Sequence, residues 1–392
     1  MTQRQLKSGY FVLEGLNSLS STFYFYYFYF FMHARFGFDN KANLTLAAMN
    51  GLVYMFAAWW SGRFAQRAGY FTSLKLGFAI MIVALAVGPF LNSPAGHIAV
   101  MLVSAVGLCF TWPALEALVC EGETPAGLQR VVGIYNLGWA GTGALGYFIG
   151  GKILDRFGLQ SLFLAPLGVL IIQLALTFWL ATKARAQRIE TTANKTPEPL
   201  EMNPRPIARA RGFLRMAWLA NPFAYIAINT LVAVMPGIAE RLGLSTTAAG
   251  FCCSLWCFAR LGAFFGLWVW PGWHYKFRWM LSAYLALIAS FVVILTAPNL
   301  VVIVSAQLIF GIAIGLIYYS SLFYSMDVGE TKGEHGGIHE AAIGLGNFVG
   351  PAVGAGSLHF LPQYANSGAV AVSVVLLGGL GGLLGIWRKT KT

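Results

Sequence analysis

The sequence predicts an all-α polytopic membrane protein, with twelve transmembrane helices arranged as two six-helix bundles related by pseudo-two-fold symmetry. The first reason is composition: 57% of the 392 residues are hydrophobic and 10% are charged, whereas an ordinary soluble domain carries roughly 25% charged residues. The second is length, because apolar runs of about 20 residues, enough to cross the bilayer hydrocarbon, recur along the chain. The third is a glycine pattern in the second half that repeats one in the first.

The apolar runs give twelve expected spans, which must be helical because the bilayer interior offers no water to the backbone. The first run is too long to be the core of a cleaved signal peptide. The polar, basic, proline-containing stretch 183–212 is expected to be a cytoplasmic linker between an N-terminal bundle, residues 1–182, and a C-terminal bundle, residues 213–392. The expected spans are 10–32, 43–61, 72–92, 95–119, 131–150, 160–182, 213–237, 244–268, 279–297, 300–326, 336–358 and 367–387.

The internal repeat is clearest between residues 133–151 and residues 337–356, which carry glycines at matching positions. Gly146 of the first stretch, for example, corresponds to Gly350 of the second. Small residues three or four apart allow two helix backbones to approach closely. Static helix packing explains such glycines, and so does the sliding of smooth helices during a transport cycle.

The net charge of +12 does not indicate nucleic-acid binding, because the basic residues lie in short loops between spans. Most of them fall on one side if the N-terminus is inside, which the positive-inside rule predicts for the cytoplasm. An even number of spans then places both termini in the cytoplasm. We expect a monomeric protein of the plasma (inner) membrane.

No enzyme motif is present in the sequence. It has no metal-spaced His/Cys cluster, no phosphate-binding glycine loop and no nucleophile elbow. The five cysteines lie in or at the ends of spans, where buried thiols act as small hydrophobes. We therefore expect no catalytic activity, metal or cofactor, and no direct use of ATP.

The loop between the second and third spans resembles the G-x-x-x-D-R-x-G-R-K loop of the major facilitator superfamily. Gly62, Arg67 and Gly69 match that motif, while Gln66 replaces its aspartate and Tyr70 its second arginine. Twelve spans, a long central linker and two related halves resemble that superfamily over the whole chain. The resemblance implies a transporter with a central cavity that works by alternating access. In that family the loop aspartate belongs to a charge cluster that braces the outward-open state.

Ionisable residues within spans are costly and are candidates for function. Arg260 lies deepest and must find a carboxylate or an anionic substrate. Glu14 and Glu116 lie about one turn inside the ends of their spans, so snorkelling to the membrane surface is an alternative for both. Glu14, Glu116 and Glu340 lie at comparable depth in the membrane. One of them is expected to pair with Arg260 across the two halves.

The pair His339-Glu340 occupies the position that Tyr135-Asn136 occupies in the first repeat. A histidine titrates near neutral pH, and a carboxyl beside it offers a second proton site. The alternative is structural, because a carboxylate in the first turn of a helix stabilises the helix dipole without moving a proton. Both interpretations remain open for these two residues.

The solute cavity is expected to be aromatic and rich in hydroxyl and amide groups. Residues 23–31 of the first span are nine consecutive aromatics, too many for one helix face, so some are expected to meet lipid or the membrane interface. Each amide could equally join two helices. The cavity candidates are Asn17, Tyr24, Tyr135, Asn136, Trp139, Asn229, Gln307 and Tyr318.

These features predict a secondary active transporter that is coupled to protons and has the lipid bilayer and a small-molecule solute as its other partners. A non-transporting membrane receptor or scaffold on the same fold is the alternative from a different class. Within transport, the aromatic residues favour efflux of an amphipathic compound. Arg260 favours uptake of a polar or anionic metabolite, and the choice between them stays open.

Overall fold

A computed structural model describes residues 2–123, 125–192, 207–328 and 333–391. Within these ranges the chain folds into helices and forms no strand. The helices are α1 (Gln3–Phe36), α2 (Asn40–Ala68), α3 (Tyr70–Val87), η1 (Gly88–Phe90), α4 (Pro94–Cys109), α5 (Trp112–Cys120), α6 (Pro125–Phe157), α7 (Ser161–Thr192), α8 (Ile207–Arg241), α9 (Thr246–Cys253), α10 (Leu255–Val269), η2 (Pro271–Trp273), α11 (Phe277–Thr296), α12 (Leu300–Asp327), α13 (Gly333–Phe360) and α14 (Ser367–Lys391).

These helices agree with the twelve expected spans, each of which falls on one helix or on one interrupted helix. The linker was expected to span residues 183–212, but part of this stretch is helical. Helix α7 continues to Thr192, and α8 already begins at Ile207. Residues 193–206, the rest of that linker, lie outside the described residues. Division of the chain into an N-terminal and a C-terminal bundle at this point remains a proposal.

The fourth span is interrupted between α4 and α5. Pro113 has no backbone N–H to donate to the carbonyl of Cys109, so the helical ladder stops there. Neighbouring helices supply the missing donors: Ser61 donates to the Cys109 carbonyl at 2.8 Å, and Ser73 donates to the Phe110 carbonyl at 2.7 Å. The interruption is thereby fixed by α2 and α3.

Nine of the described helical segments are long and apolar enough to cross a membrane by length and composition alone. Helices α1, α2 and α6 are not among them, although they contain 34, 29 and 33 residues. At 1.5 Å per residue, α1 alone is about 51 Å long, more than the bilayer hydrocarbon. Their lower hydropathy reflects polar residues, some of which line a central cavity.

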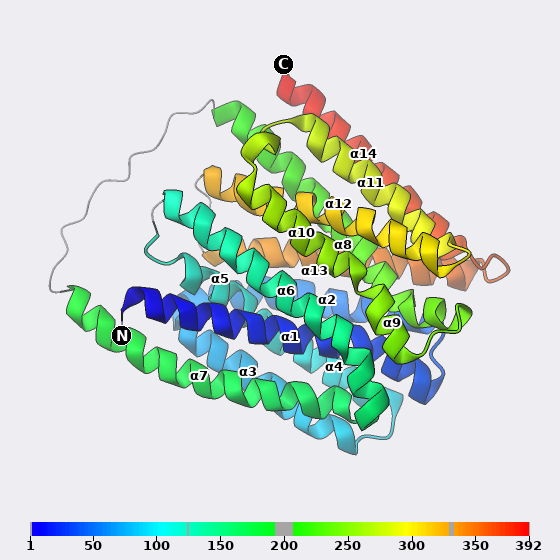
Figure 1. Ribbon diagram of the computed structural model, residues 1–392, viewed down its shortest axis with the longest axis horizontal. Helices are drawn as coiled ribbons and strands as arrows, with labels where there is room; N and C mark the ends of the chain where they lie inside the picture. The colour runs from blue at the N-terminus through cyan, green and yellow to red at the C-terminus, as the bar shows by residue number, and fades with distance from the viewer. Residues whose placement is uncertain (1, 124, 193–206, 329–332, 392) are drawn as a thin grey trace.

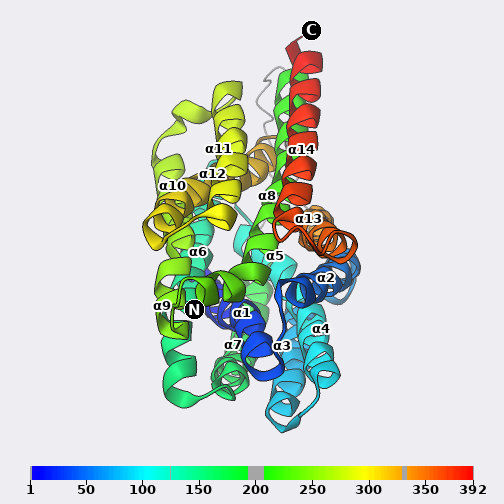
Figure 2. The same ribbon diagram turned by 90° about the vertical axis from the view of Figure 1, so that its right-hand side faces the viewer.

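The two halves of the chain lie against each other along their length. Figure 2 shows α1, α3, α4 and α7 on one side of the molecule and α8, α11, α12 and α14 on the other. Helices α2 and α13 pack side by side at the junction. Their close approach depends on glycine: a Cβ at Gly51 would collide with the backbone of Asn347, and one at Gly344 would lie 2.6 Å from the Cα of Met55.

The sequence repeat corresponds to equivalent packing in the two halves. Helix α6 packs on α1 and α13 packs on α8 (Figure 1). A Cβ at Gly146 would lie 2.7 Å from the carbonyl oxygen of Leu19, and a Cβ at the corresponding Gly350 would lie 2.5 Å from that of Ile226. Each glycine lets the first and fifth spans of its own half meet backbone to backbone.

The aromatic run of α1 does not face lipid, so that expectation is wrong. None of residues 23–31 is exposed, and only Phe25 and Tyr26 are half-buried. The reason is the central position of α1, which packs against α6, α7 and α8. At this level α1 therefore faces other helices and the central cavity.

The ends of the helices define two sides of the molecule. One side, called the linker side, is where α7 ends and α8 begins. The start of α1 lies there, because Gly9 contacts Leu180 of α7. The end of α14 lies there too, because Thr390 contacts Gly212 of α8. Both ends of the described chain thus lie on this side. On the opposite side, where α1 and α8 end, polar contacts between the halves include His33 Nε2 and Glu240 Oε2, which lie 3.5 Å apart.

Candidate functional site

A cavity of about 160 Å³ lies between the two halves. Its wall is built from α1, α2, α4, α5 and α6 of the first half and from α8, α10, α12 and α13 of the second. The cavity therefore changes shape whenever the halves move relative to each other. It contains six of the predicted site residues: Tyr135, Trp139, Asn229, Arg260, Tyr318 and Glu340.

Arg260 contributes a buried cation to this cavity and is only 6% exposed. Its guanidinium carbon lies 4.5 Å from the ring centroid of Trp139 and 4.9 Å from that of Trp256. Among the described residues it forms no ion pair within 4.0 Å. The expected pair with a membrane carboxylate is therefore not formed, and two indole rings occupy the neighbouring space instead.

The position of Arg260 follows from the packing of α10 on α12. A Cβ at Gly311 would collide with the Trp256 carbonyl, and one at Gly315 would lie 3.4 Å from the Arg260 carbonyl. Two glycines one turn apart thus bring the α10 backbone onto α12. With its backbone held there, the Arg260 side chain extends into the cavity and towards α6.

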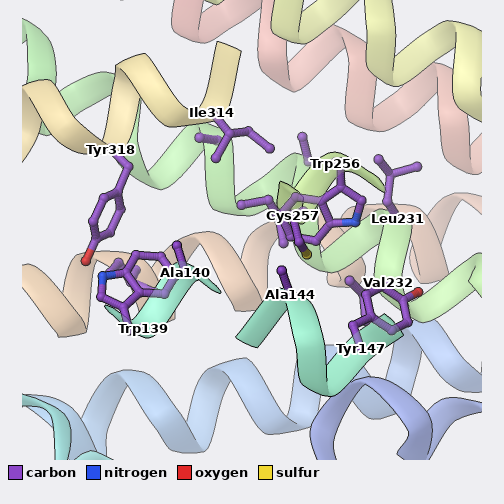
Figure 3. Packing of buried hydrophobic residues seen from close by; sticks show 14 of the residues in the cluster. Trp139, Ala140, Ala144, Tyr147, Leu231, Val232, Trp256, Cys257, Ile314 and Tyr318 are labelled. Atoms are coloured by element: carbon purple, nitrogen blue, oxygen red, sulfur yellow. The ribbon is translucent and has the colours of Figure 1, made fainter. Parts of the chain in front are cut away.

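Trp139 is held in a fixed orientation on α6. Its indole Nε1 donates to Asn136 Oδ1 at 2.9 Å, and its carbonyl accepts a hydrogen bond from Ser18 at 2.6 Å. The indole meets the ring of Tyr318 edge to face, with centroids 5.3 Å apart (Figure 3). These contacts bring α1, α6 and α12 together around one aromatic corner of the cavity.

Glu340 is the buried carboxyl of the cavity wall, and it is 8% exposed. The hydroxyl of Tyr54 donates to its Oε2 at 2.5 Å. Because Tyr54 belongs to α2 and Glu340 to α13, this hydrogen bond joins the two halves. Beside Glu340, the ring of His339 lies 5.9 Å from that of Tyr318, and Nε2 of His339 has no hydrogen-bond partner in the part of the chain that the structure describes.

Amide groups form a second polar part of the wall. Asn229 donates through Nδ2 to Asn347 Oδ1 and to the Tyr225 carbonyl. Asn50 also lines the cavity, and no described residue forms a hydrogen bond with its Oδ1. An acceptor that no protein group satisfies is available to a bound solute.

Glu14 and Glu116 lie near the cavity without lining it. Glu14 is fully buried, so it does not snorkel to the surface, and its carboxyl interacts with the hydroxyl of Tyr135. It interacts electrostatically with Glu116 and with Glu340. Three carboxyls from α1, α5 and α13 therefore converge beside the cavity.

The remaining candidates serve helix packing in this structure. Asn17 donates to Thr111 at 3.1 Å, Gln307 donates to the Cys252 carbonyl at 3.1 Å, and Asn136 holds Trp139. Tyr24 packs against Phe163 of α7, with ring centroids 6.1 Å apart. None of these four side chains lines the cavity.

Several cavity residues escaped the sequence prediction. The signal for those on α1 is present, because they recur every three or four positions on one helix face. Residues of α2 and α8 carry no such signal, since single tyrosines and asparagines are common in membrane helices. The missed polar residues are Ser18, Ser21, Thr22, Tyr26, Asn50, Tyr54, Tyr225 and Asn347.

The loop between α2 and α3 is a tight turn. Gly69 adopts φ +90°, a conformation that favours glycine, and its N–H donates to the Ala65 carbonyl at 3.0 Å. Gly62 is buried in α2, whereas Gln66 and Arg67 are exposed. In the described part of the chain Arg67 forms no ion pair.

No group of three or more His, Cys, Asp or Glu residues within the described ranges could hold a metal ion. The chemistry available at the site is therefore that of one guanidinium, nearby carboxyls, amides and aromatic rings. Groups of these kinds are able to bind a small solute and to exchange protons.

A family model described as Major Facilitator Superfamily matches residues 10–351. No curated protein sequence matches the chain.

Two solved structures share the fold over nearly the whole chain. One is the human organic anion transporter MFSD10 (TETRAN), with a TM-score of 0.68 and 14% identity over 98% of this chain and 99% of that chain. The other is a bacterial homologue of the human drug peptide transporters PepT1 and PepT2, with a TM-score of 0.66 and 16% identity. This match also covers 98% of this chain and 99% of that chain. At these identities the likeness establishes the fold alone.

Proposed function

This chain belongs to the Major Facilitator Superfamily of membrane transporters, and from that premise we propose that it couples the movement of a small solute to protons by alternating access. The two halves rock about the central cavity, which opens to one side of the membrane at a time. The family assignment sets aside the alternative of a non-transporting receptor or scaffold.

The observation that carries the proton coupling is the hydrogen bond between Tyr54 and Glu340 at 2.5 Å. It joins the two halves through an ionisable group that also lines the solute cavity. Gain or loss of a proton at Glu340 changes the strength of this bond and the charge next to the solute. One group thus links proton binding both to solute binding and to movement of the halves.

The surroundings of Glu340 favour this role. Seven described residues interact electrostatically with Glu340. They are carboxyls, tyrosines and a thiol, and none of the seven is a cation. A buried carboxylate without a counter-ion is costly, and a proton removes that cost. These neighbours are Glu14, Tyr54, Cys109, Glu116, Tyr135, Tyr225 and Tyr318.

The orientation proposed for this transporter places the linker side in the cytoplasm of a cell with a plasma (inner) membrane. Both ends of the described chain lie on that side, and basic residues in its loops support the assignment. A single chain contributes both walls of the cavity, so we propose that a monomer transports.

Reconstitution into proteoliposomes tests the coupling. A panel of radiolabelled carboxylates, amines, sugars and neutral amides is offered with and without an imposed pH gradient. We expect one class to accumulate above equilibrium only while the gradient is present, and a protonophore to abolish that accumulation. Accumulation that a protonophore does not change would contradict proton coupling.

A further inference from the structure

Resting on the proposed transport function, we propose that the solute is a small organic anion, with one carboxylate bound by Arg260 and an apolar body held by aromatic rings. The first observation is a buried guanidinium that lacks a counter-ion. Among the described residues, its Nε has no hydrogen-bond partner and no carboxylate lies within 4.0 Å. A buried cation is costly without an opposite charge, so the bound solute supplies that charge.

The two indoles orient this guanidinium without replacing its anion. Trp139 and Trp256 lie over it at 4.5 and 4.9 Å. Cation–π contacts use the face of an aromatic ring, whereas the guanidinium N–H groups need lone pairs in their own plane. Two parallel N–H groups match the two oxygens of a carboxylate. Arg260 is thus prepared for a planar, bidentate acceptor.

The charge of the cavity selects a monoanion. Among the described residues that line it, Arg260 is the sole lysine or arginine. A dicarboxylate or a phosphate dianion would bring a second negative charge that no cation in the wall balances. Glu340 lines the same cavity, so a proton on Glu340 keeps the loaded site close to neutral. The anion and the coupled proton therefore favour each other's binding.

The rest of the wall indicates the body of the solute. Aromatic side chains from both halves surround the cavity, and planar apolar groups stack well on such rings. Asn50 Oδ1 provides a free acceptor for one N–H or O–H group of the solute. The aromatic residues are Phe25, Tyr26, Tyr54, Trp112, Tyr135, Trp139, Tyr225 and Tyr318.

Calorimetric titration of the purified protein with phenylacetate and with phenylacetamide tests the proposal. The two probes share size and ring, and they differ in the charge of one end. We expect phenylacetate to bind and the neutral amide to bind about tenfold more weakly or not at all. Equal affinity for both probes, or binding of neither, would overturn the anion site. This comparison uses the unmodified protein and does not depend on any variant folding.

Variants then assign the binding to Arg260. Arg260→Gln should abolish phenylacetate binding, and Arg260→Lys should restore part of it, because an ammonium cannot form the bidentate pair. Arg35→Gln is the matched control, since Arg35 lies outside the cavity and bonds to Asn92. Full phenylacetate affinity in folded Arg260→Gln would show that the arginine only packs between the indoles.

The proposals of an anion site and of proton coupling can be refuted independently. Phenylacetate binding through Arg260, without accumulation of any solute in a pH gradient, would refute the coupling and keep the anion site. Accumulation of an amine or a sugar in a pH gradient, with no preference for phenylacetate over its amide, would keep the transporter and refute the anion site.

Discussion

At Glu340, one hydrogen bond connects the two halves inside the wall of the cavity. Glu340→Gln keeps the shape of the side chain and an oxygen that accepts the Tyr54 hydroxyl, but it cannot exchange a proton. We expect pH-driven accumulation to be lost. Exchange of labelled for unlabelled solute without a gradient should persist, because the packing is kept. Both are measured in the same proteoliposomes.

Two companion variants separate the proton from the hydrogen bond. Tyr54→Phe removes the bond and keeps the carboxyl, so pH-driven accumulation should be weakened rather than lost. Glu240→Gln neutralises a carboxylate that is 71% exposed on the opposite side, and accumulation should be unchanged. If Glu340→Gln still accumulates solute with the pH gradient, Glu340 only stabilises the start of α13 and carries no coupled proton.

At the scale of the helices, the repeated glycines make a prediction about packing. Gly350→Ala would place a Cβ 2.5 Å from the Ile226 carbonyl oxygen and 2.7 Å from Thr230 Oγ1. Backbone atoms cannot give way, so α13 and α8 must separate. We expect a loss of about 1–3 kcal/mol in stability, observed as a lower thermal unfolding temperature. Gly146→Ala should act similarly on α6 and α1.

Gly356→Ala is the control for this pair, because it lies on the same helix and a Cβ there meets nothing within 4 Å. It should leave stability unchanged or raise it slightly, since alanine is the better helix former. The transport rate per folded molecule decides whether the glycines serve static helix packing or the sliding of helices during transport. An unchanged rate in Gly350→Ala indicates static packing, and a reduced rate indicates that these helices slide.

For the molecule as a whole, hydrophobic length and the glycine repeat were sufficient to predict the twelve spans and their two-fold arrangement. The break before Pro113 has a sequence signal, although the span was predicted as continuous. The break at Ser254 has none, because serine is tolerated within helices and packing decides there. Local patterns thus define helices well and define their irregularities poorly.

The site was less predictable because it is formed between the halves. Arg260 and Glu340 were found from their charge, which is conspicuous in an apolar span. Tyr54 was not, since its importance arises only when α2 meets α13. The expected Arg260–carboxylate pair was wrong because periodicity places residues at a depth but does not show which side chains face each other.

On the opposite side, the two halves make a polar contact that no single span reveals. Asp155 at the end of α6 accepts hydrogen bonds through Oδ2 from the backbone N–H and the hydroxyl of Thr247, at 2.9 and 2.6 Å. Thr247 lies in the first turn of α9. A carboxylate from one half therefore caps a helix of the other half, where the helix dipole favours negative charge. Opening this side must break that cap.

Asp155→Ala should shift the protein towards the conformation open on the opposite side. Loss of an exposed, charge-assisted contact is expected to change the ratio of open to closed conformations by roughly fivefold, about 1 kcal/mol.

Spin labels at positions 156 and 242 report the distance between the halves on the opposite side. They are introduced in a variant with the five native cysteines replaced. Asp39→Ala is the matched control, because Asp39 caps α2 within its own half through the Ala42 N–H at 2.8 Å. More long distances in Asp155→Ala alone would support the inter-half cap. Equal distributions in both variants and the parent would show that Asp155 does not hold this side closed.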